Sequence, residues 1–226
     1  MTTKMPAEFA DFVAVAALDE RAVIVENMLW EQFPEIGGFL THTSPFQLLV
    51  AVVLSARCTD AQVNRVTPQL FAVAPTAQQL AQISQGELEK IIHGVGFFRQ
   101  KARALIGLSQ RIYRDFAGAV PMNFEDLETL PGVGHKSASV VIGQCTSTPT
   151  FPVDTHVWRL ARRWGLSMGK TVELVEKDLK TIFPSEKWMG LHLRMIVYGR
   201  SNCTARGCDG TRCQICQRIR GGKLDA

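Results

Sequence analysis

Apolar positions recur at helical spacing along most of this chain, and no segment shows the strict alternation typical of strands. Capping residues stand directly before several of these segments; Ser44 followed by Pro45 is one example. We therefore predict helices from Pro45 to about Ala56 and over residues 60–72, 77–82, 85–93, 100–116, 155–164, 172–182 and 186–198, the last of them capped by Ser185, with a pair of helices spanning 124–145.

This pattern predicts an all-α protein of about ten short helices packed helix on helix. The segment from Phe46 to Ala56 is apolar on nearly every face, which predicts a buried helix. A chain of 226 residues, 46% hydrophobic, supports one large or two small domains. No stretch approaches ~18 uninterrupted apolar residues, and the first residues do not resemble a signal peptide. We expect a cytoplasmic monomer with no membrane contact, associated with the nucleoid if it is bacterial.

The net charge of +4 is concentrated near the end of the chain. Residues 200–226 contain six basic and two acidic side chains, which account for the whole net charge. A basic segment of this kind suits attraction to phosphates. For residues 219–226 alone we expect a solvated tail.

The segment Leu-Pro-Gly-Val-Gly-His-Lys, residues 130–136, predicts a tight turn that leads directly into a helix. Gly132 and Gly134 allow a sharp turn and a close approach to a ligand, because neither has a Cβ atom. The amides that follow lie at a helix N-terminus, where they are free to donate to an anion. With Asn123 capping a short helix over 124–130, the unit has the pattern of a helix-hairpin-helix that binds a DNA phosphate; a plain loop between core helices is the alternative.

Lys136 and Asp154, which both follow this turn in the sequence, are candidates for catalysis. Lys136 lies in the first turn of its helix, where the helix dipole and partial desolvation favour the neutral, nucleophilic amine that forms Schiff bases. Asp154 directly precedes another predicted helix, so its simplest role is that of an N-cap. A carboxylate beside a lysine can also stabilise positive charge on a reacting sugar or orient a water molecule.

Four cysteines, Cys203, Cys208, Cys213 and Cys216, have the spacing C-x4-C-x4-C-x2-C. Thiols this close together in an intracellular protein indicate a metal or iron–sulfur site rather than disulfides. The spacing alone leaves open which metal is bound, and a tetrahedral zinc site is the simplest alternative.

The turn LPGVGHK, the segment VDTHV around Asp154 and the C-terminal cysteine cluster resemble, in that order, the endonuclease III family of bifunctional DNA glycosylase/AP lyases. The segment from Phe46 to Asp60 looks like the first barrel helix of that family and the loop after it. The resemblance implies the helix-hairpin-helix DNA glycosylase fold, with a six-helix barrel over residues 38–148 that contains the hairpin at about 124–145. It also implies a discontinuous, helical iron–sulfur cluster domain formed by residues 1–37 and 149–226.

The resemblance also assigns roles to individual residues. Lys136 and Asp154 match the catalytic pair. Phe97 falls where the family places an apolar wedge, which suits the gap that an extruded nucleotide leaves in DNA. Arg57 departs from the family, which commonly has a glutamine there, so the preference for the opposite base is open. The other DNA-binding candidates are the hairpin residues Leu130, Pro131, Gly132, Val133, Gly134 and His135, the cleft residues Ser55 and Asp60, and His156 near the flipped base.

The cysteine spacing departs from the family pattern, C-x6-C-x2-C-x5-C. If Cys213 and Cys216 match the middle pair, Gly222 stands where the last ligand should be, and Cys208 can supply the fourth thiolate instead. The resemblance favours a [4Fe–4S] cluster over zinc. A loop without metal is a third alternative.

The implied function is base-excision repair of double-stranded DNA that contains damaged bases or abasic sites. The enzyme would remove an oxidised pyrimidine through a Schiff base on Lys136 and cleave the strand by β-elimination. Two rival interpretations remain: a monofunctional adenine or mismatch thymine glycosylase, which usually lacks this lysine, and a non-catalytic helix-hairpin-helix DNA-binding protein with a structural metal, which needs neither Lys136 nor Asp154.

Overall fold

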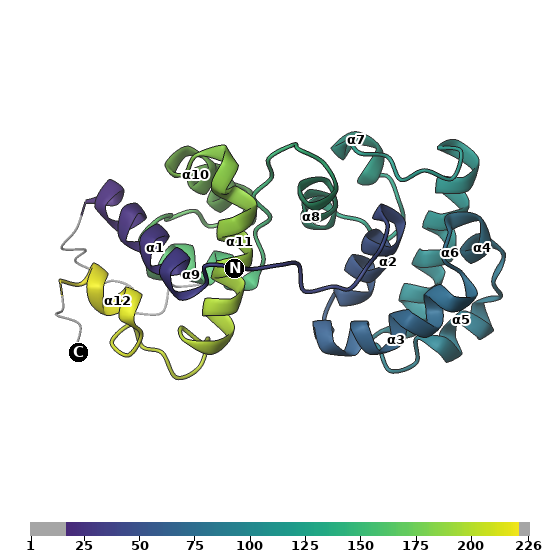
Figure 1. The fold of residues 1–226 in the computed structure, drawn as a ribbon, viewed down its shortest axis with the longest axis horizontal. Helices are drawn as coiled ribbons and strands as arrows, with labels where there is room; N and C mark the ends of the chain where they lie inside the picture. The colour runs from purple at the N-terminus through teal and green to yellow at the C-terminus, as the bar shows by residue number, and fades with distance from the viewer. Residues whose placement is uncertain (1–16, 222–226) are drawn as a thin grey trace, which may run out of the picture. The chain divides into compact units, whose positions relative to one another are not determined.

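The computed structural model describes residues 17–221, and over this range every regular element is a helix (Figure 1). The fold class is therefore all-α, as the sequence predicts. The described residues divide into two compact units: residues 38–150 form one, and residues 17–37 together with 151–221 form the other. No helix of the described residues is long and apolar enough to cross a membrane.

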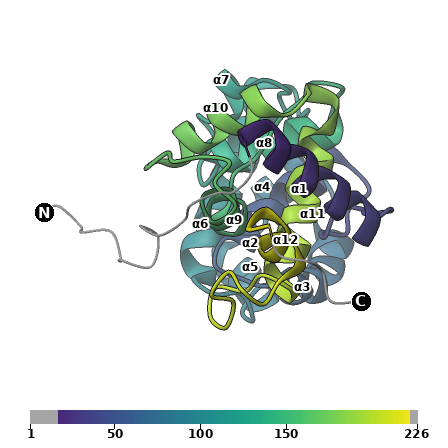
Figure 2. The same cartoon turned by 90° about the vertical axis from the view of Figure 1, so that its left-hand side faces the viewer.

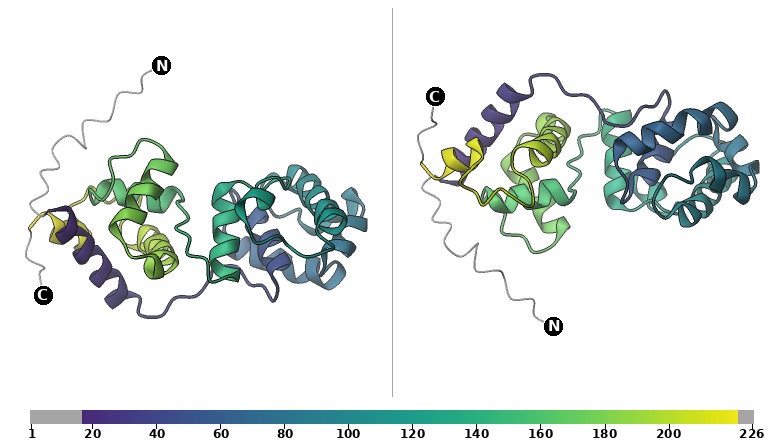
Figure 3. Two further views of the ribbon diagram at one scale, coloured as in Figure 1. Left: turned by 90° about the horizontal axis from the view of Figure 1, so that it is seen from above. Right: turned by 90° about the horizontal axis from the view of Figure 1, so that it is seen from below.

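The unit of residues 38–150 is built around a central apolar helix, α2. Each residue of α2 from Leu48 to Leu54 is buried, because α3, α6 and α8 all pack against this helix. The buried helix predicted from Phe46 onward is confirmed. Figures 1 and 3 show these elements gathered around one core: α2 (Pro45–Ser55), α3 (Asp60–Val73), α4 (Ala77–Gln82), α5 (Gln85–Ile91), α6 (Phe98–Asp115), α7 (Phe124–Leu127) and α8 (His135–Cys145).

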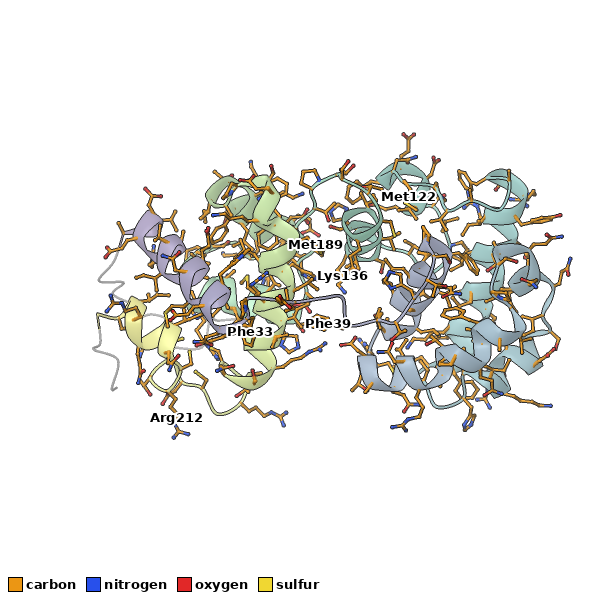
Figure 4. The ribbon with its side chains drawn as sticks, viewed as in Figure 1. Phe33, Phe39, Met122, Lys136, Met189 and Arg212 are labelled. Atoms are coloured by element: carbon orange, nitrogen blue, oxygen red, sulfur yellow. The ribbon has the colours of Figure 1, made fainter. Side chains whose placement is uncertain are left out.

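The second unit packs α11 against α9 and α1, and α12 against α1. Figure 2 labels α1, α9, α11 and α12 of this unit. Arg194 joins distant segments of the unit, since it donates to the carbonyls of Phe33 (labelled in Figure 4) and Pro34 at 2.9 and 2.8 Å. The elements are α1 (Leu18–Gln32), α9 (Thr155–Arg163), α10 (Val172–Ile182), a 3-10 turn (Ser185–Lys187), α11 (Trp188–Ser201) and α12 (Gln214–Ile219).

Hydroxyl caps start helices in both units, as the sequence predicts. Each hydroxyl accepts a hydrogen bond from the backbone amide three residues on, at 3.2 to 3.3 Å. Because this interaction is local, it can be recognised from sequence alone. The capping residues are Ser44, Thr59, Thr76, Ser84 and Thr171.

Several expected boundaries were wrong. The helix α6 begins two residues before the predicted position, because Phe97 has a left-handed backbone that turns the chain into the helix without a side-chain cap. The last long helix begins at Trp188 rather than after Ser185, since a 3-10 turn intervenes. The first hairpin helix ends at Leu127 rather than at 130.

Two helices were not predicted at all. The helix α1 starts after Ala17 without a side-chain cap, so it lacks a start signal in the sequence. The helix α12 has six residues and is capped by the Sγ atom of Cys213. Its last residue, Ile219, is fully buried, which corrects the expected solvated tail at that position; residues 222–226 lie outside the described part of the chain.

Candidate active site and metal centre

The glycine turn is held in place by its neighbours in the unit of residues 38–150. Gly132 has a φ of +80°, and a Cβ atom there would lie 3.0 Å from the Cβ of Ala104, so both conformation and space require glycine. The side chains of Leu130 and Val133 are buried in the core. A Cβ on Gly134 would meet nothing within 4 Å, so the backbone is open there. Leu130 and Val133 can therefore contribute to DNA binding only through their backbone.

Side chains also brace the turn from both sides. Asn123 caps α7 by accepting from the amide of Asp126 at 2.8 Å, as predicted. His135 pairs with Glu128 at 2.7 Å, and its ring stacks on Phe124 with 5.0 Å between centroids. Since Phe124 and Glu128 belong to α7 and its C-terminal cap, His135 ties the start of α8 to the preceding helix.

The N-terminus of α8 provides donors for an anion. The first backbone hydrogen bond of this helix runs from the amide of Ala138 to the carbonyl of Gly134, at 3.0 Å. The amides before it have no intrahelical acceptor by helix geometry, and the first turn contains no acidic side chain. Lys136 is half-buried in this turn, and Figure 4 labels it beside α8.

A pocket of about 320 Å³ opens beside the turn. At its rim the guanidinium of Arg57 lies 5.7 Å from the ring centroid of Phe97, and Phe97 is 56% exposed. The pocket therefore brings three of the predicted residues together: Arg57, Phe97 and Gly132. Its lining consists of Val53, Ala56, Arg57, Phe97, Gln100, Lys101, Ala104 and Gly132.

Ser55 and Asp60 are half-buried and do not line this pocket. The hydroxyl of Ser55 donates to the carbonyl of Val52 at 2.8 Å, within the last turn of α2. Asp60 is the first residue of α3. Both residues flank the loop that carries Arg57.

Asp154 belongs to the other unit and caps α9, as predicted. Its Oδ1 accepts from the amides of His156 and Val157 at 2.8 and 2.9 Å. Both bonds fall on Oδ1, so capping uses one oxygen of the carboxylate. Lys136 and Asp154 thus lie in different units.

His156 is half-buried on the first turn of α9. Burial lowers the pKa of its imidazole below the usual value; the carboxylate of Asp154 opposes this shift, and the cations of Arg159 and Arg200 add to it. The neutral ring is therefore the favoured form near neutral pH, and it can both donate and accept a hydrogen bond.

The four predicted cysteines come together in a buried cluster. Their Sγ atoms all lie within 4.8 Å of one another, with Cys203 to Cys208 at 3.6 Å and Cys203 to Cys216 at 3.9 Å. None of them forms a disulfide. Four buried thiols that converge on one point form a metal-ligating set, compatible with the metal cluster that the sequence predicts.

Sequence reasoning missed the arginines around this cluster. Arg163 is buried and donates to the Sγ of Cys203 at 3.1 Å, and Arg159 donates to the carbonyl of Cys203 at 3.0 Å. A hydrogen bond with Cys213 raises the pKa of the Cys203 thiol, whereas the guanidinium of Arg163 acts in the opposite direction, toward the thiolate that binds metals. The sequence shows only that Arg159 and Arg163, four residues apart, share one face of a helix; it does not show that this face meets the cysteines.

Comparison with known proteins places these features in a family. The model of the HhH-GPD superfamily of base excision DNA repair proteins matches residues 50–185. Endonuclease III from Synechocystis is 39% identical over 89% of this chain and 92% of its own length. Endonuclease III from Treponema pallidum is 42% identical over 87% of this chain and 93% of its own length.

Solved structures agree with this comparison. A trapped endonuclease III–DNA covalent intermediate, an estranged-adenine complex, matches with a TM-score of 0.83 and 37% identity, over 88% of this chain and 94% of the other. A non-covalent endonuclease III–DNA complex matches with a TM-score of 0.84 over the same shares. A thermostable thymine-DNA glycosylase, 22% identical with a TM-score of 0.72, shares the fold alone.

Proposed function

This chain belongs to the endonuclease III family of base excision DNA repair glycosylase/lyases, and we propose that it removes oxidised pyrimidines from double-stranded DNA with Lys136 as nucleophile. The observation that carries the proposal is the position of Lys136 in the first turn of α8, directly after a glycine turn with an open backbone. A lysine placed there faces whatever sugar-phosphate the hairpin amides bind.

In the proposed reaction, the neutral amine of Lys136 attacks C1′ of the damaged nucleotide. The bond between C1′ and the base breaks, and the base leaves with the electron pair and takes up a proton. The C1′–O4′ bond of the resulting aminal then opens, because the lysine nitrogen gives its lone pair to a C1′=N double bond, and O4′ takes up a proton from the solvent. The protonated Schiff base acidifies C2′, and loss of a C2′ proton expels the 3′ phosphate by β-elimination. The hairpin amides contribute by holding a neighbouring phosphate.

Asp154 is the proposed partner of Lys136 in this chemistry. A carboxylate stabilises the positive charge that develops on the sugar as the base departs. Capping of α9 by Oδ1 supports this proposal, because it fixes the orientation of the carboxylate. We assign the cleft positions to Ser55 and Asp60, the position near the flipped base to His156, and the wedge to Phe97, whose large exposed apolar side chain suits that role.

We also propose that the four cysteines hold a [4Fe–4S] cluster. In this proposal residues 38–148 form the barrel, and the remaining residues form the cluster domain. The all-thiol donor set, its burial and family membership support this proposal. Zinc is a second candidate, because the Cys203 sulfur lies 3.6 and 3.9 Å from the sulfurs of Cys208 and Cys216, close to the separation in a tetrahedron with metal–sulfur bonds of about 2.3 Å. The bound group would fold this domain rather than react.

Borohydride trapping tests the assignment of the nucleophile. Reduction during turnover of a duplex with an oxidised pyrimidine should join protein to DNA, and mass spectrometry should find the adduct on the peptide that contains Lys136. Lys136→Gln should form no adduct yet bind the duplex, because the hairpin binds through backbone amides. If Lys136→Ala still forms the adduct fully, the nucleophile is another residue.

A further inference from the structure

A short segment joins the helix that carries Lys136 to Asp154. This segment, residues 149–153, lies between α8 and α9 and has no regular secondary structure; we call it the connector. Pro149 and Pro152 fix their own φ angles, and each restricts the residue before it to an extended conformation. Few backbone angles of the connector can therefore vary.

The connector is anchored to α8 near its start. The hydroxyl of Thr150 donates to the carbonyl of Ser139 at 2.7 Å, and both residues are buried. Ser139 belongs to α8 and lies three residues after Lys136, a rise of about 4.5 Å along the helix axis. The bond from Thr150 thus ties the connector to the helix that holds Lys136, within one turn of that lysine.

The connector is also held along its length and at its end. Residues 151–153 are all buried, and the ring of Phe151 packs against Phe183 with 6.5 Å between centroids. Asp154 follows directly and caps α9 through Oδ1. The four residues after Thr150 span at most about 14 Å of chain. Because this chain is short, stiff and buried, it transmits a shift at Thr150 to the carboxylate of Asp154 instead of absorbing it.

We propose that Thr150 is a positioning residue for base release, because its bond to Ser139 sets where Asp154 stands relative to Lys136. This inference rests on the proposed function, in which Asp154 and Lys136 act on the same nucleotide. Thr150 is 1% exposed, so its side chain acts through the connector and not on DNA. It is the last residue of the unit of residues 38–150, and its hydroxyl anchors the chain where the chain leaves that unit.

Two reactions of the same enzyme separate this role from a structural one. In the proposed function, release of a damaged base depends on Asp154, because positive charge develops on the sugar as the base departs. A preformed abasic site has no base to release; its C1′ aldehyde condenses with the amine of Lys136, and water leaves as the Schiff base forms. A displaced Asp154 should therefore slow base release and leave the reaction with an abasic site nearly unchanged.

Thr150→Val tests the proposal, because valine has the shape of threonine without the hydroxyl. The carbonyl of Ser139 keeps the acceptor role that helix geometry gives it within α8, so the variant should fold. Base release from an oxidised-pyrimidine duplex in single turnover should slow by about tenfold to a hundredfold, up to the loss that a misplacement of about 1 Å causes. Borohydride trapping on a preformed abasic duplex should stay close to the wild-type rate. Thr150→Ser keeps the hydroxyl and should restore base release.

Thr146→Val is the matched control. The hydroxyl of Thr146 donates to the carbonyl of Ile142 at 2.8 Å, so this variant also removes a hydroxyl bond to a carbonyl of α8. That bond joins residues four apart at the end of the helix and does not hold the connector, although the same hydroxyl accepts from the amide of Thr148 at 3.0 Å. Base release and trapping should both stay close to the wild-type rates. A loss of base release as large as that of Thr150→Val would overturn the specific role of Thr150.

Base release at the wild-type rate in a folded Thr150→Val, or an equal loss in both reactions, overturns the inference, and so does a Thr150→Ser variant that does not recover. If circular dichroism shows that Thr150→Val is unfolded, Thr150→Ala replaces it with the same expected results, because alanine places no methyl group against the Ser139 carbonyl. Trapping of the wild type together with an unaffected Thr150→Val leaves the proposed function standing and removes only this inference. A wild type that neither releases the base nor forms an adduct overturns both.

Discussion

Replacing Asp154 should separate its capping role from its proposed chemical role. Its Oδ1 accepts from two backbone amides at the start of α9, at 2.8 and 2.9 Å. Asparagine also has an Oδ1 atom that accepts hydrogen bonds, and it caps helices about as well as aspartate. Alanine has no acceptor and leaves both amides without this partner.

The magnitudes follow from these two bonds. Loss of an N-cap costs about 0.5–2 kcal/mol, so Asp154→Ala should lower the free energy of unfolding by about that amount. In a chain of this size, 1 kcal/mol corresponds to a fall of about 2–4 °C in melting temperature. Asp154→Asn should melt close to the wild type. Both variants should lose most of their glycosylase turnover, because neither has the carboxylate charge.

The assay pairs calorimetric melting with single-turnover kinetics on one lesion duplex. Thr171→Ala is the matched control, since it removes a cap from α10 in the same unit, where the hydroxyl accepts from Leu174 at 3.3 Å. It should lower the melting temperature as Asp154→Ala does and leave turnover intact. Full turnover in Asp154→Asn would refute the chemical role, and an Asp154→Asn melting point as low as that of alanine would refute the capping argument.

Three further predictions concern the turn, the cluster and His156. Gly132→Ala should destabilise the unit of residues 38–150 by about 1–3 kcal/mol, because φ is +80° and the new methyl meets Ala104; chemical denaturation measures this. Cys208→Ser should lower the metal content by elemental analysis, and full retention of metal would exclude Cys208 as a ligand. The folded-state pKa of His156 is lowered, so the folded state binds fewer protons than the unfolded state and stability should fall as the pH drops below about 6.5. His156→Gln should flatten that part of the stability profile, and an unchanged profile would refute the assignment.

Some features of this protein could be read from short stretches of sequence. The caps at Ser44, Thr59 and Thr76 each join a side chain to an amide three residues away, so a window of four residues contains the whole interaction. The same holds for the glycine turn, because Gly132 is required by its own backbone angle. The close spacing of the cysteines likewise predicted a shared ligand set.

Other features depended on residues far apart in the sequence. Arg163 lies 40 residues before Cys203, and Lys101 lies 45 residues after Ala56, so no local pattern indicates either contact. Phe97 has a left-handed backbone that a phenylalanine does not prefer by itself.

The sequence by itself thus determined the helical class, the order of the motifs and the candidate residues within each motif. Only the tertiary structure decided which of them share a pocket, which carbonyls the buried Lys101 satisfies, and which cation faces the cysteine sulfurs. The physical reason is the sequence separation of the interacting residues. Caps and turns depend on residues within one helical turn, whereas a pocket or a buried ion contact forms only after distant helices have packed together and excluded water.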